Sequence, residues 1–130
     1  MKDFRELKVW EKAHQLTLDV YKQTTIFPRD EVYGLTSQLR RSATSIPSNI
    51  AEGCGRDGDA DLARFLQIAL GSTSELEYQL QLAHELGYLK DEPYRQLSDC
   101  SIEVKRMLGA FLQTLRKRTR YMPETDHPSE

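Results

Sequence analysis

The stretch SQLRRSATSIPSNIAEGCGR, residues 37–56, reads as one amphipathic helix with a proline inside it. The apolar residues of this stretch, together with a leucine that precedes it, recur at spacings of three and four and so share one side of a helix. They are Leu35, Leu39, Ala43, Ile46 and Ile50. This rhythm does not shift at Pro47, although a proline in a helix interior removes a backbone donor and costs about 3 kcal/mol. The stretch therefore predicts a continuous helix that is kinked at Pro47.

Polar residues around Pro47 predict how such a kink is tolerated. Because proline has no N–H group, the carbonyl of Ala43, one helical turn earlier, loses its hydrogen bond. Ser45, Ser48 and Asn49 are close enough in the sequence to offer hydrogen bonds to the backbone groups that the proline frees. Two interpretations stay open here, a purely structural kink and a kink placed for function.

Two helices are predicted in the first half of the chain. Apolar residues repeat at helical spacing over residues 7–27, and Pro28 ends this first helix. The second helix begins between residues 30 and 35 and continues through the proline. It ends near Gly53, because glycine readily adopts the left-handed conformation that closes helices.

Two more helices are predicted in the second half. Asp57 or Asp59 can cap the start of a third helix, which extends to Leu86. A fourth helix starts at Asp91 and keeps its apolar spacing until about Tyr121.

Four helices joined by short turns, with no alternating strand pattern, predict an all-α fold. We expect one domain over residues 1–122, an antiparallel four-helix bundle with up-down-up-down connectivity. Residues 123–130, PETDHPSE, combine prolines with polar and acidic residues and have no apolar anchor. This composition predicts a disordered C-terminal tail.

The composition favours a cytoplasmic protein without a metal or cofactor. The 130 residues include no secretory signal and no long apolar run, and the formal net charge is −2. Cys54 and Cys100 fit neither a disulfide framework nor a metal motif, so we expect reduced thiols. Glu11 and His14 match half of the Glu-x-x-His motif of di-iron bundles, but the second motif is missing because Gln81 precedes His84 at that spacing.

No catalytic residues are predicted, because no serine or cysteine nucleophile has a recognisable base and no phosphate-binding glycine loop is present. We therefore expect a non-enzymatic protein without a small-molecule substrate. An enzyme that uses a pocket between subunits stays open as a third interpretation.

The third helix carries more apolar residues than one bundle face needs. At about 100° per residue, Ile68, Leu82 and Leu86 point well away from the stripe that contains Leu62 and Leu80. A helix that is apolar beyond one sector indicates a contact with another subunit. These three residues are therefore predicted to form an oligomer interface.

Basic residues gather on the last helix and recur next to the proline helix. Residues 104–122 contain six basic side chains and no acidic one. Such a row suits contacts with nucleic-acid phosphates, although cations near a helix C-terminus also complement its macrodipole without any ligand. The predicted nucleic-acid-binding residues are Arg40, Arg41, Lys105, Arg106, Arg116, Lys117, Arg118 and Arg120.

Three segments carry a resemblance to a known family. They are LKVWEKAHQLTLDVY, YGLTSQLRRSATSIPSNIAEGCGR and FLQIALGSTSELEYQL. The chain resembles the four-helix bundle proteins of the 23S rRNA intervening sequence, and the most specific block includes Pro47, Asn49, Glu52 and Gly53. The resemblance implies a bacterial, cytosolic protein that forms a homopentameric ring, in a family that supplies no catalytic residues.

The fold that this family implies is also known in the accessory variability determinant of diversity-generating retroelements. That relative is a basic barrel that binds nucleic acid and a reverse transcriptase, whereas this chain has an acidic balance. Our leading hypothesis is a homo-oligomer whose basic helix ends contact RNA or DNA. The alternative is a protein–protein scaffold in which the same arginines pair with acidic residues of other subunits, such as Glu75, Glu77 or Glu85.

Overall fold

The computed structural model describes the backbone of residues 3–126 and the side chains of residues 3–118. Within these limits the chain forms four long helices, two short 3-10 turns and no strand. The long helices are α1 (Lys8–Thr24), α2 (Leu35–Cys54), α3 (Asp59–Glu85) and α4 (Asp91–Asp126). The short turns are η1 (Phe4–Glu6) and η2 (Arg29–Glu31).

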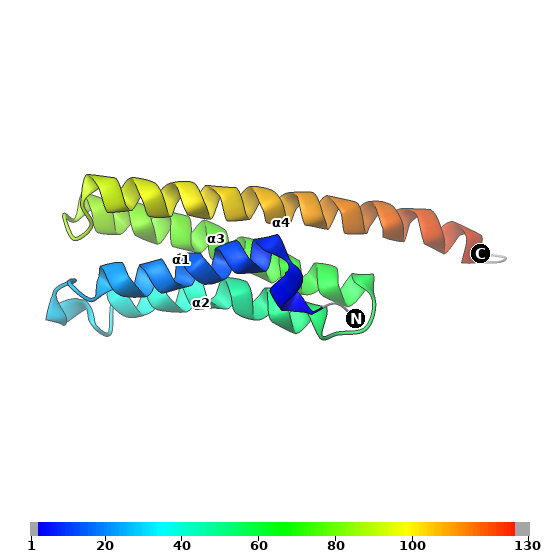
Figure 1. Cartoon of the computed structure of the whole chain (residues 1–130), viewed down its shortest axis with the longest axis horizontal. Coiled ribbons are helices and arrows are strands. Elements are labelled where there is room, and N and C mark those ends of the chain that lie inside the picture. The colour runs from blue at the N-terminus through cyan, green and yellow to red at the C-terminus, as the bar shows by residue number, and fades with distance from the viewer. Residues whose placement is uncertain (1–2, 127–130) are drawn as a thin grey trace.

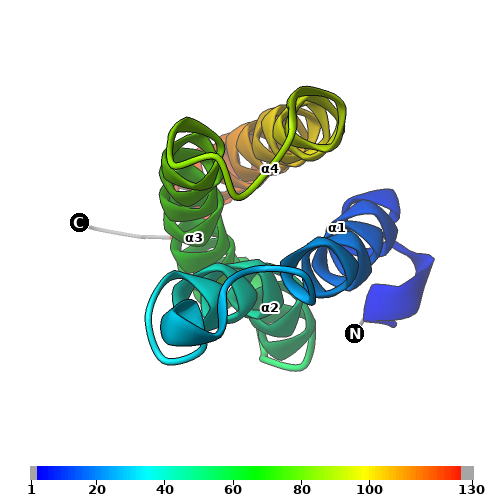
Figure 2. The ribbon, with the colours of Figure 1, turned by 90° about the vertical axis from the view of Figure 1, so that its left-hand side faces the viewer.

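The four helices pack as a bundle in which each helix contacts the next one in the chain. α1 also contacts α4, whereas the described parts of the diagonal pairs α1 and α3, and α2 and α4, make no close backbone contact. The end view in Figure 2 shows the helices around a common centre in chain order. Figure 1 shows that successive helices run in opposite directions along the long axis.

Side-chain bonds between α3 and α4 agree with the opposite directions in Figure 1. Lys105 of α4 bonds to Glu77 of α3, whereas Arg116, further along α4, bonds to Gln67, which lies earlier in α3. Residues later in α4 thus contact residues earlier in α3, as expected for antiparallel helices.

The apolar stripe of α2 forms the centre of the hydrophobic core. Leu39, Ala43, Ile46 and Ile50 are completely buried, and residues of all four helices join them in one core cluster. The prediction that these residues form one apolar side of α2 is therefore confirmed. Each large core side chain removed from water contributes about 1.5–3 kcal/mol, which stabilises the bundle far more than helix propensity alone.

α2 continues through Pro47, and the carbonyl that the proline leaves open takes its hydrogen bond from another helix. The hydroxyl of Thr17 in α1 lies 2.9 Å from the carbonyl oxygen of Ala43, and it also lies 2.9 Å from that of Ala13. Our expectation that neighbouring residues of α2 would serve this carbonyl is wrong, because Asn49 donates to the carbonyl of Ser45 instead, at 2.8 Å. A bend of the helix axis stays a prediction.

Gly53 has a different role from the one that its sequence context predicted. It lies inside α2 and does not adopt a left-handed conformation. A Cβ atom at this position would lie 2.9 Å from Cδ1 of Leu62 and 3.0 Å from Cβ of Phe65, so the absent side chain lets α2 and α3 approach closely. The left-handed glycine of this turn is Gly58, with a φ of 86°.

Gly58 is also the N-cap residue of α3, and no side chain caps this helix start. The predicted caps, Asp57 and Asp59, are therefore both wrong. Asp59 is instead the first residue of the helix, where its carboxylate forms an ion pair with Arg118 of α4.

α4 is longer than the sequence predicted. The helix passes through Pro123 and ends at Asp126, so the predicted end near Tyr121 is wrong. Pro123 removes only the bond of its own N–H group, and only three residues of the helix follow it. Figure 1 shows that this last part of α4 projects beyond the other helices, and residues 127–130 of the predicted tail lie outside the described residues.

Candidate nucleic-acid interface

A shallow groove of about 560 Å³ crosses the outer face of α2 beside α1. We call it the α2 groove. Hydroxyl and arginine side chains dominate its lining, which also includes one tyrosine. No acidic residue of the described part of the chain lines it. The lining residues that matter below are Tyr21, Arg40, Arg41, Thr44 and Ser48.

Contacts with α1 hold the guanidinium group of Arg40 in place. Its Nε atom donates to Oγ1 of Thr24 at 2.8 Å, and its Nη2 atom lies 3.4 Å from the carbonyl oxygen of Tyr21. The guanidinium carbon also lies 4.7 Å from the centroid of the Tyr21 ring, a cation–π contact. Arg40 is therefore a positive charge fixed in position before any ligand arrives.

Arg41 occupies the exposed part of the same groove. Within the described side chains, neither Arg40 nor Arg41 forms an ion pair with an acidic residue. Thr44 and Ser48 follow at helical spacings of three and four, so their hydroxyl groups share the face of Arg41. This face thus combines positive charge that lacks a paired carboxylate with short hydrogen-bonding side chains.

The basic residues of the last helix have a different environment. We call Lys105, Arg106, Arg116, Lys117 and Arg118 the α4 row. The ammonium group of Lys105 lies 2.7 Å from the Glu77 carboxylate. Arg106 lies 2.7 Å from Glu103, and Arg118 lies 2.9 Å from Asp59. Much of the positive charge in this row is therefore paired with carboxylates of the same chain.

Among the side chains that the structure describes, the other members of the row have no such carboxylate. Arg116 donates to the amide oxygen of Gln67 at 3.1 Å, and Lys117 is exposed. The side chain of Arg120 lies outside the described residues.

The fold does not bring the α4 row and the arginines of the α2 groove together within one chain. α2 and α4 form a diagonal pair of the bundle. Arg41 lies in the half of α2 near the α1–α2 connection, whereas Arg118 lies beside the start of α3, at the opposite end of the bundle in Figure 1. One chain therefore presents two separate basic surfaces.

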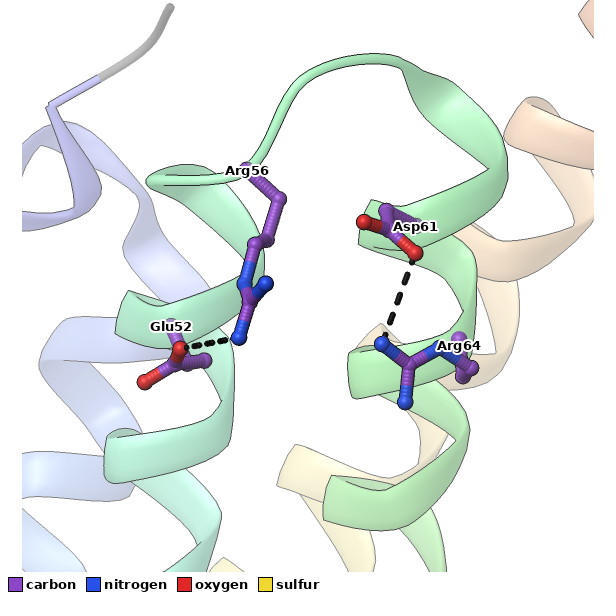
Figure 3. A network of polar contacts seen from close by, with 4 residues as sticks. All are labelled: Glu52, Arg56, Asp61 and Arg64. Atoms are coloured by element: carbon purple, nitrogen blue, oxygen red, sulfur yellow. Dashed lines mark hydrogen bonds and ion pairs between the residues drawn. The ribbon is translucent and has the colours of Figure 1, made fainter.

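The remaining residues of the specific sequence block make local contacts. Figure 3 shows Glu52 paired with Arg56 at 2.8 Å, across the turn from the pair formed by Asp61 and Arg64. The guanidinium carbon of Arg56 lies 5.0 Å from the ring centroid of Phe65, and that of Arg64 lies 4.5 Å from it. Phe65 belongs to the closely packed junction of α2 and α3. These contacts fasten the turn between the two helices.

The apolar residues predicted on α3 differ in exposure. Ile68 is 43% exposed and Leu86 is 51% exposed, whereas Leu82 is half-buried against the core. Tyr78, which sequence reasoning did not single out, lies one turn from Leu82 and is 62% exposed. Gly71 shares this side of α3, and a Cβ atom there would meet no other atom within 4 Å.

The described helices do not include one that is both long enough and apolar enough to cross a membrane.

The exposed residues of α3 form a strip along one side of an otherwise amphipathic helix, which is typical of a contact between proteins.

The groups whose pKa values shift lie outside the α2 groove. A hydrogen bond from His84, at 2.7 Å, lowers the pKa of Asp91, and the bond that Tyr88 donates to Glu31 raises the tyrosine pKa. Burial raises the pKa of the Cys100 thiol. Each shift has a local structural cause.

No cluster of three or more potential metal-ligating side chains occurs in the part of the chain that the structure describes. Glu11 and His14, which match half of a di-iron motif, are both exposed. The His14 ring stacks on Trp10, with 4.8 Å between ring centroids.

Comparison with known proteins places this architecture among related chains. Residues 5–110 match the family described as 23S rRNA-intervening sequence protein. Among solved structures, the chain is similar to a crystal structure of a protein with unknown function from the S23 ribosomal protein family of Bacteroides thetaiotaomicron. That pair has a TM-score of 0.72 and 28% sequence identity, over 80% of this chain and 97% of the other. No curated protein matches the chain.

Proposed function

Because this chain belongs to the 23S rRNA-intervening sequence protein family, we propose that it is a non-enzymatic adaptor that binds RNA or DNA. It acts as a homo-oligomer, with five copies as the expected number, in the cytoplasm. The α2 groove supplies the contact with nucleic acid, and the exposed strip of α3 joins the subunits.

The observation that carries this proposal is the lack of acidic residues around the two arginines of the α2 groove. An arginine already paired with a carboxylate must give up that contact before it binds a phosphate. Among the described side chains, Arg40 and Arg41 have no such contact to break, and guanidinium groups match the geometry of phosphate oxygens. Binding through such contacts is largely independent of sequence and weakens as salt increases.

The oligomer is supported by the exposure of Ile68 and Tyr78 along α3 and of Leu86 at its C-cap. Covering apolar area from water contributes about 25 cal/mol per Å², so a second copy seated on this strip would be stabilised. Gly71 leaves room for close approach of another helix, since nothing in its own chain fills that space. Several copies would also multiply weak phosphate contacts through avidity.

A binding titration tests the proposal directly. A labelled oligonucleotide is titrated with the purified protein at about 50 and 200 mM salt, and the slope of log K against log salt gives the number of phosphate contacts. We expect binding at low salt and steep weakening at high salt. Absence of binding at low salt would overturn the proposal, and light scattering of the same sample measures the number of subunits.

A protein–protein scaffold is the second candidate, and the α4 row favours it. Lys105 and Arg118 already pair with Glu77 and Asp59, which shows that these helices can neutralise basic residues with carboxylates. Combined replacement of four basic residues of α4 by alanine separates the candidates. These residues are Arg116, Lys117, Arg118 and Arg120. Loss of assembly would favour the scaffold, whereas an intact oligomer that still binds nucleic acid through the α2 groove would favour the adaptor.

A further inference from the structure

We infer that the α2 groove binds one nucleotide of a single-stranded segment, with the base stacked at Tyr21 and the phosphate at Arg41. This inference rests on the proposed function and narrows it. The partner is single-stranded RNA or DNA, and Tyr21 is a binding residue that neither the sequence patterns nor the family relationship indicated.

Tyr21 provides an aromatic surface at the wall of the groove. Its side chain is 43% exposed, and the Arg40 guanidinium lies 4.7 Å from its ring centroid. Bases stack on tyrosine rings and on arginine planes, and this stacking does not depend on base identity. The Tyr21–Arg40 pair therefore offers a flat, positively charged platform for a base.

The phosphate side of the site lies on α2. Arg41, Thr44 and Ser48 share one face of the helix, and all three line the groove together with Tyr21. The arginine can donate two parallel hydrogen bonds to phosphate oxygens, and the Ser48 hydroxyl can donate another. The Thr44 hydroxyl already donates its proton to the carbonyl oxygen of Arg40. A nucleotide that stacks at Tyr21 thus finds hydrogen-bond donors along the adjacent helix.

The size and chemistry of the groove favour a single strand over a duplex. A volume of about 560 Å³ lies in the range of about 300–1,000 Å³ found for small-ligand sites, so the groove suits one nucleotide. In a duplex, each base is already stacked between its neighbours, and only the phosphates can reach Arg41. Tyr21 therefore contributes to binding only when the base is unpaired.

Tyr33 provides a matched control. It is also an exposed tyrosine, at 95%, but it precedes α2 and does not line the α2 groove. None of the cation–π contacts of the described residues involves its ring. Removal of this ring tests whether any surface tyrosine affects binding.

The experiment compares a labelled single strand with a hairpin duplex of the same length by fluorescence anisotropy at low salt. The proteins are the wild type, Tyr21→Ala, Tyr21→Leu, Tyr21→Phe and Tyr33→Ala, with folding checked by urea denaturation. We expect the wild type to bind the single strand more tightly than the duplex. Loss of the Tyr21 ring should weaken single-strand binding about tenfold and leave duplex binding unchanged, because stacking at one base contributes about five- to 150-fold.

The controls separate stacking from packing. Tyr21→Phe should retain the preference for single strands, and Tyr21→Leu, which keeps the bulk beneath Arg40 but not the ring, should lose it. Tyr33→Ala should behave like the wild type.

Two outcomes would overturn the inference, and they differ in their meaning for the proposed function. If Tyr21→Ala and Tyr21→Leu keep the single-strand affinity while Arg41→Glu lowers it, the groove binds phosphates without stacking, and only the inference fails. If the wild type binds neither oligonucleotide at low salt, the proposed function fails as well.

Discussion

The α2 groove and the α4 row contain similar basic side chains but meet different neighbours. In the α4 row, Lys105 and Arg118 face carboxylates of α3. In the α2 groove, Arg40 contacts a hydroxyl group, a carbonyl oxygen and an aromatic ring of α1. A count of basic residues along a sequence therefore does not measure how much positive charge a fold leaves for a ligand.

The difference follows from helix adjacency. α4 packs beside α3, so its basic residues lie close to the carboxylates of that helix. The outer face of α2 lies beside the end of α1, where threonines and carbonyl groups supply neutral partners. We therefore expect the two surfaces to respond differently to the same type of substitution.

The largest expected effect comes from Thr17→Val. This substitution destabilises the packing of α1 on α2, which supports the α2 groove, but it changes no residue that lines the groove. The buried carbonyl of Ala43 would lose its hydrogen-bond donor, since Pro47 supplies none. An unsatisfied buried polar group costs about 1–3 kcal/mol, and we expect a loss of this size in the free energy of unfolding. Urea denaturation measures it.

Thr44→Val is the matched control for that substitution. Its hydroxyl is exposed and donates to the carbonyl of Arg40 within the same helix, so its loss should change stability little. Equal losses in the two variants would contradict a special role for the bond between α1 and α2.

The next largest effect compares one arginine from each surface. Arg41→Glu should weaken binding of a single-stranded oligonucleotide about tenfold or more, because a phosphate contact is replaced by repulsion; tenfold corresponds to about 1.4 kcal/mol. Arg106→Glu should change it less than about threefold, because Arg106 is already paired with Glu103. Equal effects, measured by anisotropy at one salt concentration, would abolish the distinction between the surfaces.

A smaller effect in the opposite direction would sharpen the comparison. The double substitution Asp59→Asn and Glu77→Gln leaves Lys105 and Arg118 without their carboxylates. We expect nucleic-acid affinity to rise about two- to threefold and the salt slope to steepen, because two more cations can reach phosphates. Each exposed pair contributes only about 0–1 kcal/mol to folding, so the protein should stay folded. An unchanged affinity and salt slope would mean that pairing does not limit the α4 row.

The smallest effect concerns the connection between α3 and α4, away from both surfaces. The hydrogen bond from His84 lowers the pKa of Asp91 in the folded state, so this pair stabilises the fold above the unfolded pKa of about 4. That contribution is lost as the pH falls through the lower folded pKa. Asp91→Asn should therefore lower the urea midpoint slightly at pH 6 and have a progressively smaller effect as the pH is lowered below the unfolded pKa. Oligonucleotide binding at pH 7 should stay unchanged.

Much of the fold could be predicted from the sequence because helical periodicity reports burial directly. The spacing of Leu39, Ala43, Ile46 and Ile50 identified the core face of α2, and all four are fully buried. The role of Gly53 could not be predicted in this way, because it depends on the distance to a different helix. The end of α4 was also predicted wrongly. A proline in the sequence indicates where a helix can end, but it does not show whether the helix continues through it.

Less of the candidate site could be predicted, because contacts between helices create it. The basic residues were visible in the sequence, but the pairing of Lys105 with Glu77 requires that α3 and α4 lie side by side in this register. Tyr21 gave no signal, since one aromatic residue on an amphipathic helix has no distinctive spacing. Its meaning depends on Arg40, which reaches it from α2.

The bond between Thr17 and Ala43 restricts the order in which mutations can accumulate in α1 and α2. If Pro47 is replaced first, the new residue supplies its own N–H to Ala43, and the Thr17 hydroxyl keeps the carbonyl of Ala13 as acceptor. If Thr17 is replaced first, the carbonyl of Ala43 stays buried without a hydrogen-bond donor. Loss of the proline followed by loss of the threonine is therefore a far easier order of mutations than the reverse.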